Sequence, residues 1–187
     1  MGQHAKALVL HKEHKAIAKE IGDRSGLGFA CVRLGICYLG VGQHAEAIRL
    51  LGEYKVISEE IGDQAALGDA YNNLGAALAK VGSYDDASRA LVRGLAELSG
   101  VERNVGAQDD RRISMFEEQQ SSYAGLQGVL LRLGEHEEQV GARYAEWALG
   151  VAEQAKARWQ ATVATRCAGH GGHKCGRWHA RRAWARA

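Results

Sequence analysis

The chain has 187 residues, a hydrophobic content of 46% and a formal net charge of +2, values that suit one domain with a core. It contains no apolar run approaching the roughly 20 residues that a membrane-spanning helix needs, and its start does not have the pattern of a signal peptide. These features exclude membrane-spanning and secreted classes from our expectations. They predict a soluble, cytoplasmic protein without membrane contact.

The small net charge hides an asymmetry along the chain. Residues 1–155 carry 16 Lys and Arg against 22 Asp and Glu, whereas residues 156–187 carry 8 Lys and Arg and no acidic residue. The composition therefore changes near residue 160. We predict that residues 161–187 form a basic, disordered tail.

The sequence repeats itself with a period of 40 residues. Placing residues 2–42 over residues 42–82 gives 20 identities in 41 positions, where chance would give only a few. A period of this size is typical of a stacked array of helical units, in which each unit buries its apolar face against its neighbours. Such arrays bind other proteins far more often than they catalyse reactions. We therefore expect a binding function, no enzyme activity and no cofactor.

Apolar periodicity within the repeats predicts four helices, over residues 3–21, 25–40, 43–61 and 65–81. Gly22 and Gly62 are expected in the left-handed conformation that ends a helix. The residues that follow them, Asp23 and Asp63, are expected to cap the next helix. Gly42 and Gly82 mark the other turn of each unit.

Two further glycines, Gly35 and Gly75, fall inside the predicted helices. Glycine in a helix interior costs about 1 kcal/mol relative to alanine. Because both copies of the repeat keep this glycine, we expect two backbones to approach each other closely there.

The period weakens in the second half of the chain. The predicted elements there are a third copy of the first helix over 84–98, a loop over 99–108, a helix from 109 to about 133 and a final helix within 136–160. This pattern divides the chain into a repeat array over 1–98, the loop, a divergent pair of helices over 109–160 and the tail.

The repeats resemble the tetratricopeptide repeat (TPR) family. The residues that carry the resemblance are Cys31, Leu34, Gly35 and Tyr38, and again Tyr71, Leu74, Gly75 and Leu78. Small residues recur at positions 7, 47 and 87. The 40-residue form, with Glu-Ile-Gly-Asp between units, is similar to the repeats of Pins/LGN adaptors and kinesin light chains. The resemblance implies an all-α, right-handed superhelical solenoid of antiparallel helix hairpins.

The later elements are similar to the TPR arrays that precede CHAT domains, on residues 109–134 and 147–158. No CHAT domain follows, and the chain starts at a helix of the second TPR type. We interpret the sequence as a piece of a longer array. The alternative function is therefore that of a regulatory array of a CHAT-domain protein, protease-like or a cytoskeletal scaffold, that is inactive alone.

The first predicted helix should expose the face that a preceding helix would cover. We therefore predict that this helix frays, or that the chain self-associates through the exposed ends of the array.

The TPR register implies which residues line a concave peptide-binding groove: Phe29, Arg33, Ile36, Asp69, Asn72, Asn73 and Lys80. Asparagine side chains can hydrogen-bond the backbone of a bound peptide, and the two cations can meet acidic side chains. Val32 and Ile36 stand where chaperone-binding TPRs have a carboxylate clamp, so chaperone tails are not the expected ligand. The expected partners are proteins bound through extended or helical segments; the alternative is that these residues are ordinary solvated positions.

The tail contains two cysteines and three histidines that could supply a zinc site: Cys167, His170, His173, Cys175 and His179. Their spacing matches no known finger. The arginines and tryptophans around them could contact nucleic acid. Against both readings stands a disordered or non-native tail, and our main expectation is no metal and no nucleic acid.

Overall fold

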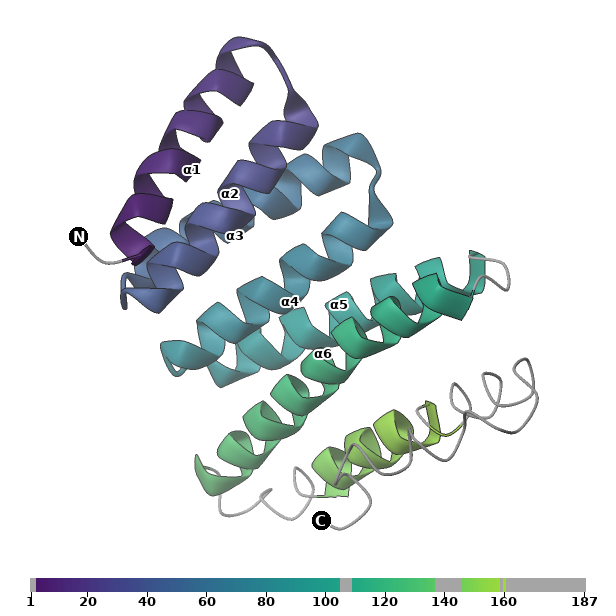
Figure 1. The fold of residues 1–187 in the computed structure, drawn as a ribbon. Coiled ribbons are helices and arrows are strands. Elements are labelled where there is room, and N and C mark those ends of the chain that lie inside the picture. Colours follow the sequence, from purple (N-terminus) through teal and green to yellow (C-terminus); the bar gives the residue numbers. More distant parts are fainter. Residues whose placement is uncertain (1–2, 105–108, 137–145, 159, 161–187) are drawn as a thin grey trace.

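The structure is a computed structural model that describes residues 3–104, 109–136, 146–158 and 160. The labelled helices are α1 (Gln3–Glu20), α2 (Arg24–Gly40), α3 (His44–Ile61), α4 (Gln64–Lys80), α5 (Tyr84–Asn104) and α6 (Asp109–His136) (Figure 1). A further helix covers residues 146–158. Within these ranges there is no strand, so the predicted all-α class is confirmed. None of the described helices combines the length and the apolar character that a membrane span requires.

The turns between the helices use the predicted residues. Four glycines have φ between 73° and 80°: Gly22, Gly42, Gly62 and Gly82. Glycine adopts this left-handed region without steric cost, which is why it ends helices so often. The backbone N–H of Gly26 donates to Asp23 Oδ1 at 2.8 Å, and that of Ala66 donates to Asp63 Oδ1 at 3.0 Å. Both predicted aspartate caps are therefore confirmed.

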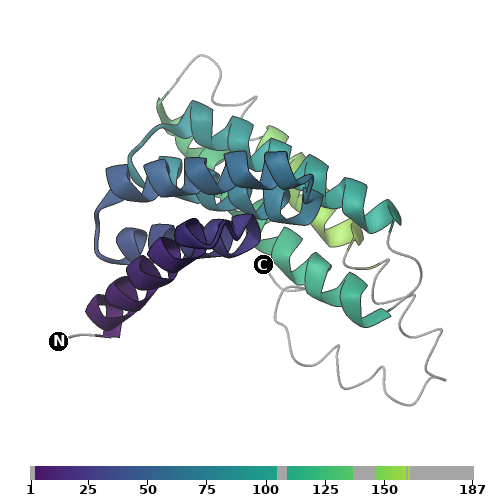
Figure 2. The same ribbon diagram turned by 90° about the horizontal axis from the view of Figure 1, so that it is seen from above.

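Each helix packs against the next one in chain order, from α1 to α6. In addition, α2 contacts α4 and α4 contacts α6. Among the described residues, no such direct contact joins α1 to α3 or α3 to α5. The helices α2, α4 and α6 therefore lie closer to one another than α1, α3 and α5 do. Figures 1 and 2 together place α1 at one end of the molecule and the helix of residues 146–158 at the other.

Buried side chains form two clusters. The N-terminal core joins α1, α2 and α3 and consists of Ala18, Leu27, Cys31, Leu34, Leu50 and Ile57. The C-terminal core joins α5, α6 and the last helix and consists of Ala87, Leu91, Leu95, Tyr123, Leu126, Val129, Leu130, Leu133, Ala148, Val151 and Ala155. The hydrophobic effect that stabilises each helix thus comes from its neighbours in the chain.

Gly35 and Gly75 lie at close approaches between helices, as predicted. A Cβ atom added to Gly35 would lie 2.8 Å from Cγ of Leu51. One added to Gly75 would lie 2.7 Å from Cγ of Leu91 and 3.2 Å from the carbonyl oxygen of Ala87. In both copies the space beside the glycine is filled by a leucine of the following helix.

The predicted loop over 99–108 begins too early. The structure continues α5 through residues 99–104 to Asn104. Leu98 is buried beside Gly68 at the start of α4, where a Cβ on that glycine would lie 2.7 Å from Leu98 Cγ. Packing against α4 therefore holds the end of α5 in place, and the helix passes through Gly100, which the sequence presents as a break. Residues 105–108 lie outside the described residues.

The first helix leaves an apolar face uncovered, as predicted. Leu10 and Ile17 are 63% and 55% exposed, and their spacing places them on one side of α1. Ile21, which directly follows α1, is 70% exposed. Leu50 and Ile57 occupy the equivalent positions of the next repeat, and they are only 2% and 3% exposed.

Candidate functional site: the α2–α4 face

The α2 half of the predicted groove is an open stripe of one aromatic, one cationic and one aliphatic residue. Phe29, Arg33 and Ile36 are spaced to lie on one side of α2, and all three are exposed. Phe29 and Ile36 expose 47% and 44% of their surface, a large fraction for such side chains. The Arg33 guanidinium lies over the Phe29 ring, with Cζ 4.8 Å from the ring centroid. This cation–π contact holds a positive charge beside an exposed apolar surface.

His14 completes this stripe from α1. Its ring centroid lies 6.0 Å from that of Phe29, with a tilt of 57° between the planes. His14 was not predicted at the groove, because it belongs to the other helix type. The contact could have been found only from the packing of α1 on α2.

The α4 half is less open than the α2 half. Asp69, Asn72 and Asn73 are half-buried, and Lys80 is exposed. Asn73 Nδ2 donates to the backbone carbonyl of Asp69 at 2.9 Å, one turn earlier in the same helix. The Asn73 amide nitrogen is therefore already used in part, and Lys80 is the most accessible of the four predicted residues.

Asn72 faces the neighbouring helix and not only the groove. Its Oδ1 is buried and has no hydrogen-bond partner among the described residues. A Cβ added to Gly94 of α5 would lie 2.3 Å from this oxygen. Asn72 thus packs between α4 and α5, and it is the least suited of the predicted residues to meet a bound peptide.

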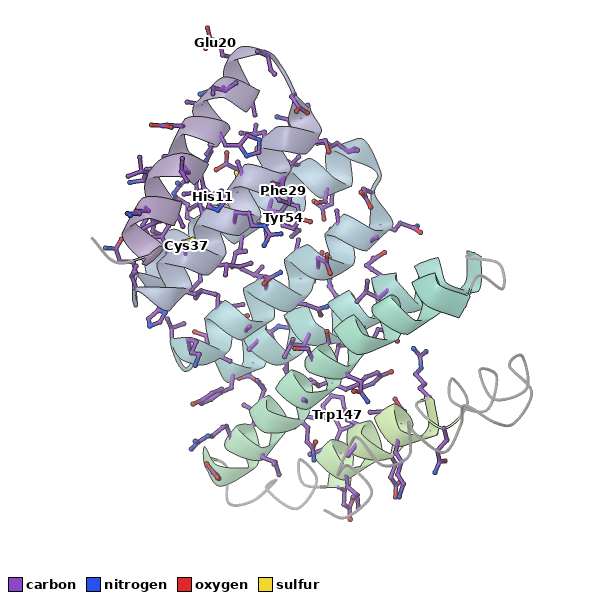
Figure 3. The ribbon with its side chains drawn as sticks, viewed as in Figure 1. His11, Glu20, Phe29, Cys37, Tyr54 and Trp147 are labelled. Carbon is purple, nitrogen blue, oxygen red and sulfur yellow. The ribbon has the colours of Figure 1, made fainter. Side chains whose placement is uncertain are left out.

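Tyr54 of α3 lies between the two halves of the face. Figure 3 labels it with Phe29 on the adjacent helix, and Cδ2 of its ring would lie 3.4 Å from a Cβ on Gly28. Burial raises the pKa of Tyr54 to about 12, and the charges of Asp69 and Asp63 add to the shift. Tyr54 therefore remains a neutral phenol at neutral pH.

A separate cavity of about 460 Å³ lies where α1, α2 and α3 meet, and its polar lining consists of Lys15, Lys19, Asp23, Arg24, Arg49 and Glu53. Lys15 Nζ lies 2.7 Å from Glu53 Oε2, and Arg49 Nη2 lies 2.6 Å from Glu46 Oε1. Burial acts to raise the pKa of Glu53, but the hydrogen bond and charge of Lys15 outweigh it, and the pKa is lowered. Lys15 and Arg49 thus each have an acidic partner, and the lining as a whole carries four cations and two carboxylates.

Cys31 is the buried thiol nearest this cavity. It is part of the N-terminal core, and burial raises the pKa of its thiol above the usual value. A reactive cysteine needs a stabilised thiolate, so this environment favours a packing role.

The five zinc candidates of the tail lie outside the described residues. Across the parts of the chain that the structure does describe, no group of three or more His, Cys, Asp or Glu side chains is placed to hold a metal ion.

No protein-family model matches the chain, and no curated protein matches it. Among solved structures, a crystal structure of BtubC (BKLC) from P. vanneervenii aligns with 92% of this chain and 76% of its own chain. The two are 20% identical, with a TM-score of 0.49. A similarity this low carries no argument about function.

Proposed function

We propose that the chain is a TPR-type helical array whose function is to bind other proteins, and that a partner segment lies across the α2–α4 face. The 40-residue repeat, the Leu-Gly positions and the glycine–aspartate turns support the assignment to this type of array. The exposed stripe of Phe29, Arg33 and Ile36 is the observation that carries the proposed binding site.

The arrangement of the helices supports the choice of this face. Because α2 contacts α4 and α4 contacts α6, while no contact among the described residues joins α1 to α3 or α3 to α5, the array should curve toward α2, α4 and α6. A concave surface surrounds a bound segment on more sides than a flat one does. The right-handed superhelix implied by the TPR resemblance has the same helices on its inner side.

The chemistry of the face suggests what the partner segment contains. Phe29 and Ile36 would bury an apolar side chain, and the two exposed cations, Arg33 and Lys80, would meet carboxylates on either side of it. We therefore expect a partner segment in which an aromatic or aliphatic residue is flanked by acidic residues.

Selection from a random peptide library on the full chain tests this proposal. We expect enriched peptides to carry an apolar residue with acidic neighbours. Phe29→Ala combined with Arg33→Glu should weaken their binding by about tenfold or more, since it removes apolar burial and reverses a charge. A control is Val92→Ala combined with Arg89→Glu, which changes one exposed apolar residue and one exposed arginine on α5. The proposal is wrong if selected peptides bind the Phe29/Arg33 variant as well as the wild type.

A further inference from the structure

The exposed apolar face of α1 is a second surface, distinct from the α2–α4 face. It consists of Leu10, Ile17 and Ile21, and we name it the α1 outer face. Large aliphatic side chains grouped on one side of a helix mark a surface that a partner covers. The internal repeat of this chain shows which kind of partner fits, because the equivalents of Leu10 and Ile17 are covered elsewhere in the molecule.

The template is the contact between α2 and α3. Leu50 and Ile57 of α3 are the repeat equivalents of Leu10 and Ile17, with identical residue types. In the N-terminal core they are buried with Leu27, Cys31 and Leu34 of α2. A helix that presents the same three side chains to α1 would therefore bury Leu10 and Ile17 in the same manner.

Two glycines give this template its close packing. A Cβ on Gly28 would lie 3.2 Å from Ile57 Cγ2, and one on Gly35 would lie 2.8 Å from Leu51 Cγ. A covering helix therefore needs a glycine directly after its first leucine to approach Ile17 as α2 approaches Ile57, because a larger residue would hold the two helices apart. The contact at Gly35 does not transfer in this way, since the repeat equivalent of Leu51 on α1 is His11.

An ion pair completes the template, and among the described residues no equivalent ion pair is formed on α1. Arg24, at the start of α2, forms an ion pair with Glu60 of α3. The repeat equivalent of Glu60 is Glu20, which is exposed and projects from the end of α1 in Figure 3. A basic residue one turn before the first leucine of a docked helix would meet Glu20.

We propose that the α1 outer face binds an amphipathic helix of a partner protein in the position that α2 takes on α3. The recognised pattern starts with a basic residue, followed three residues later by Leu-Gly. A small residue stands four positions after that leucine, and a second leucine stands three positions further on. The helix runs antiparallel to α1, with its basic start beside Glu20.

The chain itself supplies the probe for this proposal. A peptide of residues 24–40, with Cys31→Ala and Cys37→Ala to prevent oxidation, is titrated into the full chain with labelled methyl groups. We expect saturable chemical-shift changes at the methyls of Leu10, Ile17 and Ile21, and none at those of Leu50 and Ile57, where α2 is already bound.

Substitutions on both sides test the contacts. Leu10→Asp combined with Ile17→Asp should lower the affinity by tenfold or more. Burying one such side chain raises the affinity by about ten- to a hundredfold, and both substitutions remove that gain. Ile61→Asp changes the exposed repeat equivalent of Ile21 and should leave the affinity unchanged. Glu20→Arg should weaken binding by about two- to fivefold, and a peptide with Arg24→Glu should restore it.

Three results would overturn the proposal. The first is the absence of saturable shifts at the α1 methyls with millimolar peptide. The second is shift changes at Leu50 and Ile57, which would mean that the peptide replaces α2 within the fold. The third is a dimer, detected by light scattering, that Leu10→Asp dissociates and that excludes the peptide, because the occupant would then be a second copy of the chain.

Discussion

Helices α1 and α3 are two copies of one sequence pattern, and their equivalent side chains differ in burial. They share Leu10 and Leu50, Ile17 and Ile57, and Glu20 and Glu60 at equivalent positions. The aliphatic residues are exposed in α1 and buried in α3, and the glutamate is ion-paired only in α3 among the described contacts. The difference is that α3 packs between α2 and α4, whereas α2 is the one described helix on which α1 packs.

The comparison shows that burial in this molecule is a property of neighbouring helices and not of the repeat unit alone. A repeat unit presents an apolar face wherever it occurs, and only the adjacent helix decides whether that face is core or surface. Substitutions at equivalent positions should therefore have unequal effects, and their sizes measure the contribution of the neighbour.

The largest difference is expected between Leu50→Ala and Leu10→Ala. Removing the buried Leu50 side chain should lower the free energy of unfolding by about 2–5 kcal/mol, because it loses apolar burial and leaves a cavity. The same change at the exposed Leu10 should alter it by less than about 0.5 kcal/mol. Urea denaturation of the two variants measures both values, and equal losses would show that Leu10 is covered in solution.

Alanine substitutions of glycines inside the helices should distinguish positions in close contact with a neighbouring helix from open positions. Gly35→Ala should destabilise the fold by about 1–3 kcal/mol, because the new methyl overlaps Leu51 and outweighs the gain in helix propensity. Gly52 of α3 has no atom near the site of its absent Cβ, so Gly52→Ala should stabilise the fold by up to about 1 kcal/mol. Thermal unfolding followed by circular dichroism checks the opposite signs. If both variants are destabilised, the helices around Gly52 are closer than described.

The two aspartate caps should behave alike, in contrast to the leucines. Asp23→Ala and Asp63→Ala each remove a single side-chain bond to a backbone N–H at a helix start, and each should cost about 1 kcal/mol. Because capping is local to one turn, the missing neighbour of α1 should not change the cost at Asp23. Unequal losses in the same denaturation experiment would indicate that the end of the array is frayed beyond α1.

The smallest effect is expected from the ion pair between Lys15 and Glu53. The pKa of Glu53 is lowered below its ordinary value of 4.5, so its stabilising contribution is complete above that pH and is lost as the pH falls through the lowered pKa. Glu53→Gln should therefore cost about 0.2–1 kcal/mol at pH 7, and this cost should disappear as the pH falls through the lowered pKa of Glu53. The repeat equivalent, Glu13, is exposed on α1, and Glu13→Gln should have no measurable effect at either pH. A loss from Glu53→Gln that persists at low pH would show that packing, and not charge, is responsible.

Much of the fold could be predicted because the ends of its helices are set by local interactions. Gly22 and Asp23 end one helix and start the next through interactions within a few residues, and such interactions can be read from the sequence. The end of α5 could not be predicted in this way. Gly100 resembles a helix stop, but Leu98 is held against Gly68 by a contact that spans most of a repeat.

The residues of the candidate site also differ in whether a local pattern is enough to predict them. The open stripe on α2 follows from helical spacing alone, since Phe29, Arg33 and Ile36 share one side of the helix. Asn72 was predicted from the TPR register, and its Oδ1 lies against Gly94. A glycine on a neighbouring helix creates the space that Asn72 enters, and helical spacing within α4 contains no information about it.

The measurement that tests the central claim most directly is amide hydrogen exchange on the monomeric chain, resolved to individual helices. If neighbouring helices decide stability, amides of α1 should exchange faster than the equivalent amides of α3 by a factor of about ten or more, since α1 lacks the apolar contacts that cover Leu50 and Ile57. Equal protection of α1 and α3 in a demonstrated monomer would contradict the claim, because the open face of α1 would then cost the helix nothing.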